Sequence, residues 1–358
     1  MRVSGWLWLA LWVPMVAGEA PEQVVVFQEA GRFGGWPANH GLWAWGNEIV
    51  VGFTSATYKW TAKGHATDRS QLFWDRQARS RDGGRSWKVE EMAVLTQGQP
   101  GAPEATELPG EMNFRSADFA LKFRFGDNNK GPSWFYYSMD RCHTWKGPFR
   151  FPTLGQKCIS ARTDYHVLGP LECVAFLSSA KSDGHEGRPL AVRTVDGGRI
   201  WQFLSWIGPE PEGFSIMPSS VPLSGGGYGV AVRRKEKGRG WIEYYTSEDA
   251  GRNWRCLNRE VTSTGTGNPP SLIRLRDGRL CLTYGYRGAP YGIRARYSRD
   301  EGASWSDEVV LRRDGSSGDL GYPRSVQRPD GKVVTVYYFN GPANRERTIE
   351  ATVWDPGS

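Results

Sequence analysis

The chain has 358 residues, of which 45 are Gly, 22 Pro and 17 Trp, and it carries a formal net charge of +7. Aromatic residues make up 13% of it, which excludes a disordered chain, and its glycines lack the regular spacing of collagen. Beyond the N-terminus no apolar run is long enough to span a bilayer, so a globular protein rich in turns is expected.

Residues 1–20 have the pattern of a secretory signal peptide. Arg2 precedes an apolar stretch at residues 6–16, and the small residues Ala17 and Gly18 follow it. We therefore expect export, with the mature protein secreted or periplasmic.

The next segment, Glu22–Ala30, is rich in β-branched residues and predicts a strand. Beyond it the sequence consists of short strands joined by Gly-Asn, Asp-Gly or Pro-Asp-Gly hairpin signals, as at residues 41–53, 272–286 and 325–339. This pattern indicates an all-β protein.

One octapeptide pattern, Ser/Thr-x-Asp-x-Gly-x-x-Trp, occurs five times in the chain. Its aspartate can accept backbone N–H groups inside a tight turn, its glycine supplies an unusual backbone conformation, and its tryptophan begins the next strand. We interpret these aspartates as structural. The copies are Ser80–Trp87, Ser138–Trp145, Thr194–Trp201, Ser247–Trp254 and Ser298–Trp305, the second with Cys142 in place of the glycine.

The aspartates of successive copies lie 51 to 58 residues apart. Such a period holds a hairpin, a third strand, the aspartate turn and a fourth strand, which is the pattern of a β-propeller blade. Five copies predict five blades, and residues 318–355 predict a sixth that lacks its outer strand, a place that Glu22–Ala30 is expected to fill. The predicted fold is an all-β, six-bladed propeller, a single domain over residues 21–358, whose ring is closed by the N-terminal strand.

In a propeller the inner strands begin around one mouth of the central channel, where a ligand site would lie. The corresponding segments here are rich in arginine, and a buried arginine is costly unless a carboxylate or an anionic ligand pairs with it. Asp118 and Asp164 are candidate internal partners, and the alternative is an acidic or polyhydroxylated ligand. The candidate ligand-binding residues are Arg32, Asn39, Asp118, Arg162, Asp164, Tyr165, Arg233, Asn268 and Arg287, with His40 and Tyr322 as candidate catalytic residues.

The loop at residues 54–70 follows the first hairpin and carries Lys59, His65 and Asp68. A long polar loop over a channel mouth is a common position for a general acid. The alternative interpretation is a solvated loop without a catalytic role.

The octapeptide resembles the Asp-box, or bacterial neuraminidase repeat, of the sialidase superfamily. The resemblance covers Ser80–Trp305. It implies the six-bladed sialidase-type fold, three arginines on the substrate carboxylate, a tyrosine nucleophile assisted by a glutamate, and an aspartate acid/base. Tyr322 lies at the position of the nucleophile, ahead of the Pro-Asp-Gly hairpin of the last blade. Arg233 and Arg287 match two of the arginines, and Asp68 lies in the loop where the catalytic aspartate is expected.

Two positions depart from the pattern of that family. Gly35-Trp36-Pro37 stands where the family has Arg-Ile-Pro, which leaves Arg32 as the nearby arginine. Ile216-Met217-Pro218 stands at the glutamate position, and Glu212 is the nearest acidic residue upstream.

Three functions remain open on this basis. The leading hypothesis is a secreted, sialidase-like glycoside hydrolase that is exo-acting on terminal acidic sugars, and it requires Arg32, Arg233 and Arg287 to converge on one carboxylate. A uronate-directed lyase or glycosidase is the second, with His40 or His166 as base and a tyrosine as acid. A glycan-binding propeller without catalysis is the third.

The expected partner is an acidic glycan, bound by a monomeric protein without a membrane span. No cofactor and no metal are expected, because the five cysteines form no Cys-x-x-Cys and no Cys/His pattern. Nucleic acid is not expected either, since no basic run is longer than residues 233–235. The positive charge is better explained by steering of acidic substrates.

Overall fold

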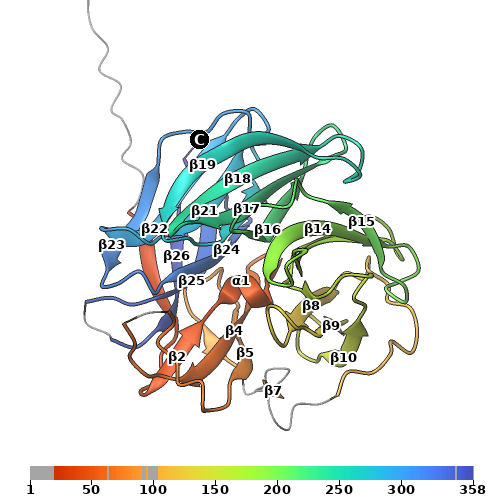
Figure 1. The fold of residues 1–358 in the computed structure, drawn as a ribbon. Coiled ribbons are helices and arrows are strands. Elements are labelled where there is room, and N and C mark those ends of the chain that lie inside the picture. Colours follow the sequence, from red (N-terminus) through yellow and green to blue (C-terminus); the bar gives the residue numbers. More distant parts are fainter. Residues whose placement is uncertain (1–19, 63, 91–93, 96–103, 343–344, 358) are drawn as a thin grey trace, which may run out of the picture.

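The computed structural model describes residues 20–62, 64–90, 94–95, 104–342 and 345–357, so the predicted signal peptide lies outside the described residues except for Ala20. The strands form six antiparallel sheets around a central axis, and the short helix α1 (Pro37–His40) lies near the centre of the ring (Figure 1). This arrangement confirms the predicted all-β, six-bladed propeller.

The blades follow one another along the chain. Blade one contains β2 (Arg32–Gly35), β3 (Leu42–Trp45), β4 (Glu48–Thr57), β5 (Trp74–Ser80), β6 (Lys88–Val89) and β7 (Val94–Leu95). Blade two contains β8 (Ala120–Phe125), β9 (Ser133–Ser138) and β10 (Lys146–Phe151). Blade three contains β11 (Ile159–Ser160), β12 (Tyr165–Val167), β13 (Cys173–Ala180), β14 (Glu186–Thr194) and β15 (Gln202–Trp206).

The second half of the ring is more regular, with four strands in each sheet. Blade four contains β16 (Phe214–Pro222), β17 (Tyr228–Glu236), β18 (Arg239–Ser247) and β19 (Arg255–Gly265). Blade five contains β20 (Pro270–Arg274), β21 (Leu280–Tyr286), β22 (Tyr291–Ser298) and β23 (Val309–Gly315). Blade six contains β24 (Gly321–Gln327), β25 (Val333–Phe339), β26 (Thr348–Trp354) and the N-terminal strand β1 (Glu22–Phe27).

The N-terminal strand closes the ring as predicted. β1 runs antiparallel to β26, with Glu22 opposite Val353 and Phe27 opposite Ile349. The side-chain oxygen of Gln23 also accepts a hydrogen bond from the Tyr337 hydroxyl at 2.9 Å. The first strand of the chain is therefore the outer strand of the last blade.

Each octapeptide forms a turn between the outer strand of its blade and the strand before it, as between β9 and β10 in blade two. In the first copy, Asp82 Oδ1 accepts the backbone N–H of Ser86 at 2.9 Å and Asp82 Oδ2 accepts the hydroxyl of the same serine at 2.6 Å. The same bond from the N–H four residues on occurs at Asp140, Asp196, Asp249 and Asp300. These aspartates are engaged within their own turns, which agrees with their structural interpretation.

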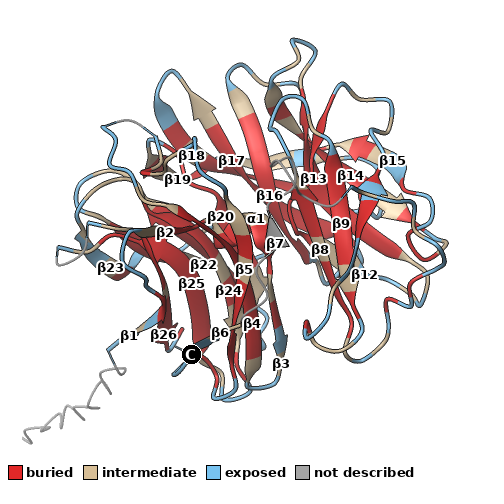
Figure 2. Ribbon diagram, turned by 90° about the horizontal axis from the view of Figure 1, so that it is seen from below, coloured by how far each residue is buried: buried red, intermediate tan, exposed pale blue. Residues whose placement is uncertain are grey.

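The hydrophobic core lies between neighbouring blades, where the faces of the strands are buried (Figure 2). In one buried cluster, Phe33 and Phe53 of blade one pack together with Val336 and Tyr338 of blade six. The inner strands are thereby held at fixed positions around the channel.

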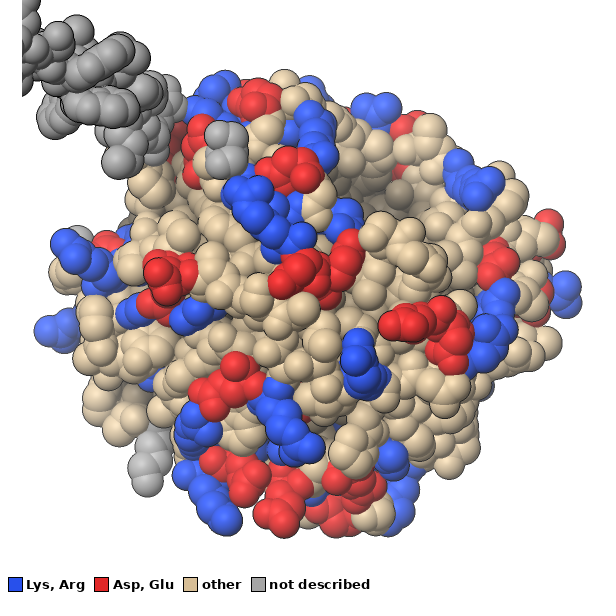
Figure 3. Space-filling view, turned by 90° about the horizontal axis from the view of Figure 1, so that it is seen from above, with Lys and Arg blue, Asp and Glu red and all other residues tan. Residues whose placement is uncertain are grey.

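Basic and acidic side chains are interspersed on the face of the molecule that Figure 3 shows. The net charge is therefore not gathered into one patch on that face. Within the described ranges, we find no helix with the length and apolar character that a bilayer crossing requires.

Candidate functional site

A pocket of about 370 Å³ lies at one end of the central channel and is called the mouth pocket below. Residues of blades one, two, three and six line it. They are Trp36, Asn39, Thr54, His65, Thr67, Arg69, Phe73, Arg124, Phe125, Gly126, Asp127, Asn128, Arg162 and Tyr322. Three of the predicted site residues, Asn39, Arg162 and Tyr322, therefore meet in one cavity.

Tyr322 is placed by an irregular start of β24. Its φ of 53° is unusual for a bulky residue, and the pairing of β24 with β25 shifts register between Gly321 and Arg324. The Tyr322 N–H donates to Asn268 Oδ1 at 3.0 Å, and Asn268 Nδ2 donates to the Leu320 carbonyl at 2.8 Å. Asn268 is fully buried, so it positions Tyr322 rather than contacting a ligand.

The same backbone device recurs in two other blades. Trp36 and Met217 have φ values of 59° and 55°, and, like Tyr322, each is followed by proline. Their side chains belong with Tyr322 to one cluster between the blades. Left-handed bulky residues cost about 1–3 kcal/mol each and gather at functional sites. Two of these pairs, Trp36-Pro37 and Met217-Pro218, are the positions where the sequence departs from the family pattern.

Two arginines flank the phenol of Tyr322. Arg233 Nη1 donates to the phenolic oxygen at 3.0 Å, and the guanidinium groups of Arg233 and Arg287 lie 5.7 and 5.4 Å from the ring centre. Burial alone would raise the pKa of Tyr322, but the charges of Arg233, Arg287 and Arg162 outweigh it and hold that pKa below its ordinary value of 10.0. The surrounding charges therefore stabilise the phenolate relative to that of a free tyrosine.

These arginines differ in how their charges are balanced. Arg162 forms an ion pair with Glu186 and donates from Nε to Asn39 Oδ1 at 3.0 Å. Arg287 donates to the Leu320 carbonyl and the Tyr338 hydroxyl, at 2.9 and 2.7 Å from Nη2. Among the residues that the structure describes, neither Arg233 nor Arg287 has an ion pair with a carboxylate, and Arg233 Nε is buried without a hydrogen-bond partner.

His65 of the blade-one loop reaches the same pocket. Its Nδ1 lies 2.7 Å from Asp319 Oδ1, and its ring lies edge-on to Tyr322 with 5.9 Å between ring centres. Burial lowers the pKa of His65, although the hydrogen bond to Asp319 opposes this effect. Sequence motifs did not indicate this pairing, since 254 residues separate Asp319 from the histidine.

The other two catalytic candidates lie outside the pocket lining. Asp68 Oδ1 accepts the backbone N–H of Ser70 at 3.0 Å, and its Oδ2 pairs with Lys59 at 3.4 Å, so its carboxylate shapes its own loop. His40 is fully buried, with Nε2 at 2.8 Å from Thr54 Oγ1, and burial holds its pKa well below 6.5. That burial removes His40 from direct contact with a ligand.

Arg32 and Asp118 also lie away from the pocket. Arg32 Nη2 donates to the Ser55 hydroxyl at 3.0 Å on the neighbouring strand. Asp118 pairs with Arg141 at 2.6 Å, because residues 112–118 form turns where an inner strand of blade two was expected. The charges that act on Tyr322 are therefore those of Arg233, Arg287 and Arg162 rather than Arg32, and of these three arginines Arg162 is the one that lines the mouth pocket.

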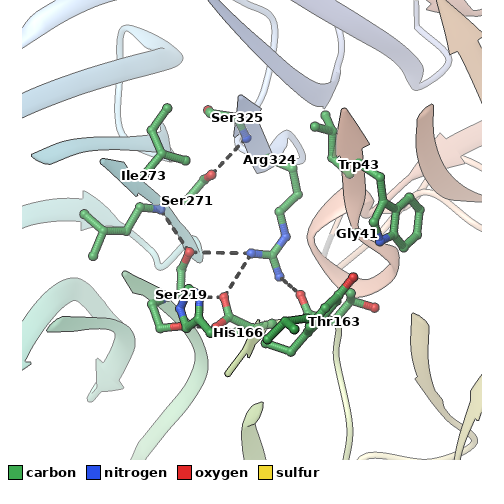
Figure 4. Close-up of a pocket in the computed structure, with 15 residues that line it drawn as sticks. Gly41, Trp43, Thr163, His166, Ser219, Ser271, Ile273, Arg324 and Ser325 are labelled. Carbon is green, nitrogen blue, oxygen red and sulfur yellow. Dashed lines mark hydrogen bonds and ion pairs between the residues drawn. The ribbon is translucent and has the colours of Figure 1, made fainter. Parts of the chain in front are cut away.

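Asp164 and Tyr165 line a second pocket, of about 410 Å³, further along the channel (Figure 4). The residues of this second pocket come after those of the mouth pocket in the same segments. Asp164 follows Arg162 and Arg324 follows Tyr322, so the second pocket lies towards the opposite end of the channel. Tyr165 accepts the Leu121 N–H at 3.1 Å through its hydroxyl. His166, an alternative base, lies here too, with Nε2 at 2.9 Å from the Ser220 hydroxyl.

Arg324 of blade six lies in this second pocket and contacts residues of blades one, three and four (Figure 4). Its guanidinium lies 3.4 Å from Asp164 Oδ2 and donates to the carbonyls of Ala38 at 3.0 Å and Thr163 at 2.6 Å. Burial outweighs the charge of Arg324 and raises the pKa of Asp164 to about 6. These polar groups are engaged with one another, which indicates a structural tie between blades.

Replacing Arg324 by methionine is expected to lower the free energy of unfolding by about 3 kcal/mol at neutral pH, because Asp164 then remains buried without a positive partner. The loss should shrink at about pH 5, where a carboxyl with a raised pKa is protonated in the folded protein. Urea unfolding measures both values. The double variant with Asp164→Asn should recover part of the loss, and an unchanged midpoint in the single variant would contradict the structural tie.

Comparison with known proteins gives the family and the fold. A family model described as "BNR repeat-like domain" matches residues 126–335. No curated protein matches the chain.

Several solved structures are similar to this one. A protein of unknown function from Dyadobacter fermentans is 20% identical with a TM-score of 0.72, covering 96% of this chain and 100% of that one. The NanB sialidase of Streptococcus pneumoniae is 12% identical with a TM-score of 0.65, covering 93% and 70%. The GH93 α-L-arabinofuranosidase of Fusarium graminearum is 15% identical with a TM-score of 0.60, covering 92% and 96%. At these identities the likeness establishes a shared fold.

Proposed function

The chain belongs to the BNR repeat-like domain family, and we propose that it is a secreted glycoside hydrolase that removes terminal acidic sugars at the mouth pocket. The observation that carries this proposal is the pair of arginines, Arg233 and Arg287, around the phenol of Tyr322. Neither has a carboxylate partner within the described part of the chain, and the fork of a guanidinium matches a ligand carboxylate. The names of the sialidase and arabinofuranosidase with similar folds support a glycoside as the substrate class.

In the proposed mechanism the substrate carboxylate binds between Arg233 and Arg287, and Asn39 and Arg162 contact the sugar from the pocket wall. The Tyr322 phenolate attacks the anomeric carbon while the bond from that carbon to the leaving oxygen breaks, and the leaving oxygen takes a proton. Water then attacks the same carbon, which releases the sugar and the tyrosine. A tyrosine suits an anionic sugar because a carboxylate nucleophile would repel the charge of the substrate.

A panel of fluorogenic glycosides with one common aglycone tests this function. We expect release from an α-sialoside or a uronide and little release from a neutral arabinofuranoside. Turnover of the neutral glycoside alone would contradict an acidic substrate. Binding to a glycan array without product from any glycoside would instead indicate a lectin-like propeller.

A uronate lyase is the second candidate, favoured by the edge-on approach of His65 and Tyr322. In that reaction a base removes the proton next to the carboxylate, the arginines stabilise the resulting anion, and an acid protonates the leaving oxygen. The role that His40 or His166 was expected to play would pass to His65. Ultraviolet absorbance from an unsaturated uronate product distinguishes elimination from hydrolysis.

A further inference from the structure

We propose that His65, held by Asp319, is the general acid/base of the mouth pocket. This inference rests on the proposed glycoside hydrolysis and names the group that serves the leaving oxygen. It assigns to a histidine of blade one the role for which Asp68 was the sequence candidate.

The orientation of His65 is restrained on several sides. Its side chain retains 24% exposure in the pocket, while its ring packs edge-on against Trp36 at 4.9 Å and Tyr322 at 5.9 Å between centres. Because Nδ1 is directed at Asp319 Oδ1, the nitrogen left for a ligand is Nε2. A ligand in contact with Tyr322 therefore also meets an imidazole.

The surroundings of Asp319 stabilise its carboxylate, which in turn orients the His65 ring. It accepts the Ala66 N–H at 3.0 Å, the Arg347 Nε–H at 2.9 Å and the Tyr338 hydroxyl at 2.8 Å. These donors and His65 overcome burial and hold the pKa of Asp319 far below its ordinary value. A buried carboxylate on Nδ1–H keeps a histidine in the tautomer that leaves Nε2 for proton transfer. Asp319 is thus a positioning residue.

The same network reaches the arginines of the site. The Tyr338 hydroxyl donates a hydrogen bond to Asp319. The same hydroxyl accepts a hydrogen bond from Arg287 Nη2 at 2.7 Å. The charges that face His65 are the carboxylate of Asp319, which raises its pKa, and the guanidinium groups of Arg287 and Arg233, which lower it. The histidine, the tyrosine and the arginines form one connected constellation.

The proton balance assigns His65 two complementary steps. The reaction starts from the form in which Tyr322 is a phenolate and His65 an imidazolium. As the Tyr322 oxygen bonds to the anomeric carbon, the imidazolium gives its Nε2 proton to the leaving oxygen, and the bond from carbon to that oxygen breaks. In the second step the neutral Nε2 removes a proton from water as the water oxygen attacks the anomeric carbon and the tyrosine oxygen leaves. The products are the free sugar and the aglycone alcohol, and both side chains return to their starting forms.

This role is tested by measuring how the loss of kcat/KM in His65→Gln depends on the leaving group of the substrate. For an acidic glycoside with a methyl aglycone, which needs protonation, we expect kcat/KM to fall by about 10²-fold or more. The 4-nitrophenyl aglycone of the same sugar leaves as an anion without protonation. For that substrate kcat/KM, which reports the glycosylation step, should fall by no more than about tenfold. The matched control is His185→Gln, which changes a histidine with 74% side-chain exposure and should affect neither substrate.

Two further variants make the outcome decisive. Asp319→Asn removes the charge that raises the pKa of His65, so the alkaline limb of the pH–rate profile should move to lower pH. Equal losses of His65→Gln on both aglycones, or a selective loss in Asp68→Asn instead, would overturn the assignment. Wild-type protein that hydrolyses no acidic glycoside would overturn the proposed function itself, which is a separate result.

Discussion

Replacing Tyr322 by phenylalanine is expected to reduce turnover of an acidic aryl glycoside by about 10³-fold or more. The change removes the atom that forms the bond to the sugar, and loss of a nucleophile is among the most damaging changes to an enzyme. The phenol accepts a hydrogen bond from Arg233 Nη1, and the loss of this one bond should leave the ring in place, so binding should persist. Steady-state kinetics with a fluorogenic sialoside, together with a binding measurement, separate these effects.

Tyr244→Phe is the matched control for this experiment. Its hydroxyl is buried in the core between blades four and five and has no hydrogen-bond partner in the described part of the chain. We expect wild-type turnover from that variant. Full activity of Tyr322→Phe would remove the tyrosine from the mechanism, and loss of binding as well as turnover would indicate a role in affinity alone.

Arg233→Met is expected to lower kcat/KM for an acidic glycoside by about 10²-fold or more without lowering the melting temperature. Truncating one partner of a buried charged contact costs roughly 2–5 kcal/mol of binding, which corresponds to that loss. In the described part of the chain the same guanidinium is buried without a carboxylate partner and donates to the Tyr322 hydroxyl, so methionine should remove a desolvation cost along with that one hydrogen bond. Activity and stability should therefore move independently or in opposite directions.

The adjacent residue supplies the control, because successive side chains of a strand point to opposite faces. Arg234 is also buried but pairs with Glu243 at 3.0 Å. Arg234→Met should lower the melting temperature and leave kcat/KM near that of the wild type. If Arg233→Met destabilised the protein as strongly as Arg234→Met and spared activity, Arg233 would be structural and the acidic substrate would lose its main support.

Local chemistry explains why the blades could be predicted. An Asp-box turn is built from bonds within a few residues, such as those from Ser86 to Asp82, so five copies of one octapeptide predicted five turns in the right places. The hairpin signals and the β-branched segment at Glu22 then accounted for six sheets and for the strand that closes the ring. Each of these signals acts over a short stretch of chain.

Local sequence signals did not predict the positions of residues on the inner strands. Asp118 was expected near the start of an inner strand, but the Asn113 side chain accepts the Arg115 N–H and the segment turns. Asp118 is consequently directed to Arg141 instead of the channel. Asp164 and Tyr165 follow Arg162 by only two and three residues, yet they line the pocket at the other end of the channel.

The sequence by itself therefore determined the architecture and the position of Tyr322 in the last blade, because these depend on repeated local turns and strands. Tertiary structure alone decided which charges meet at that tyrosine. His65 and Asp319 lie at 2.7 Å across 254 residues, and Arg233 reaches the phenol across 89, only because the ring brings distant blades to one axis. Burial and neighbouring charges on that axis then shift the pKa of each group, and both are properties of the closed ring that no single segment carries.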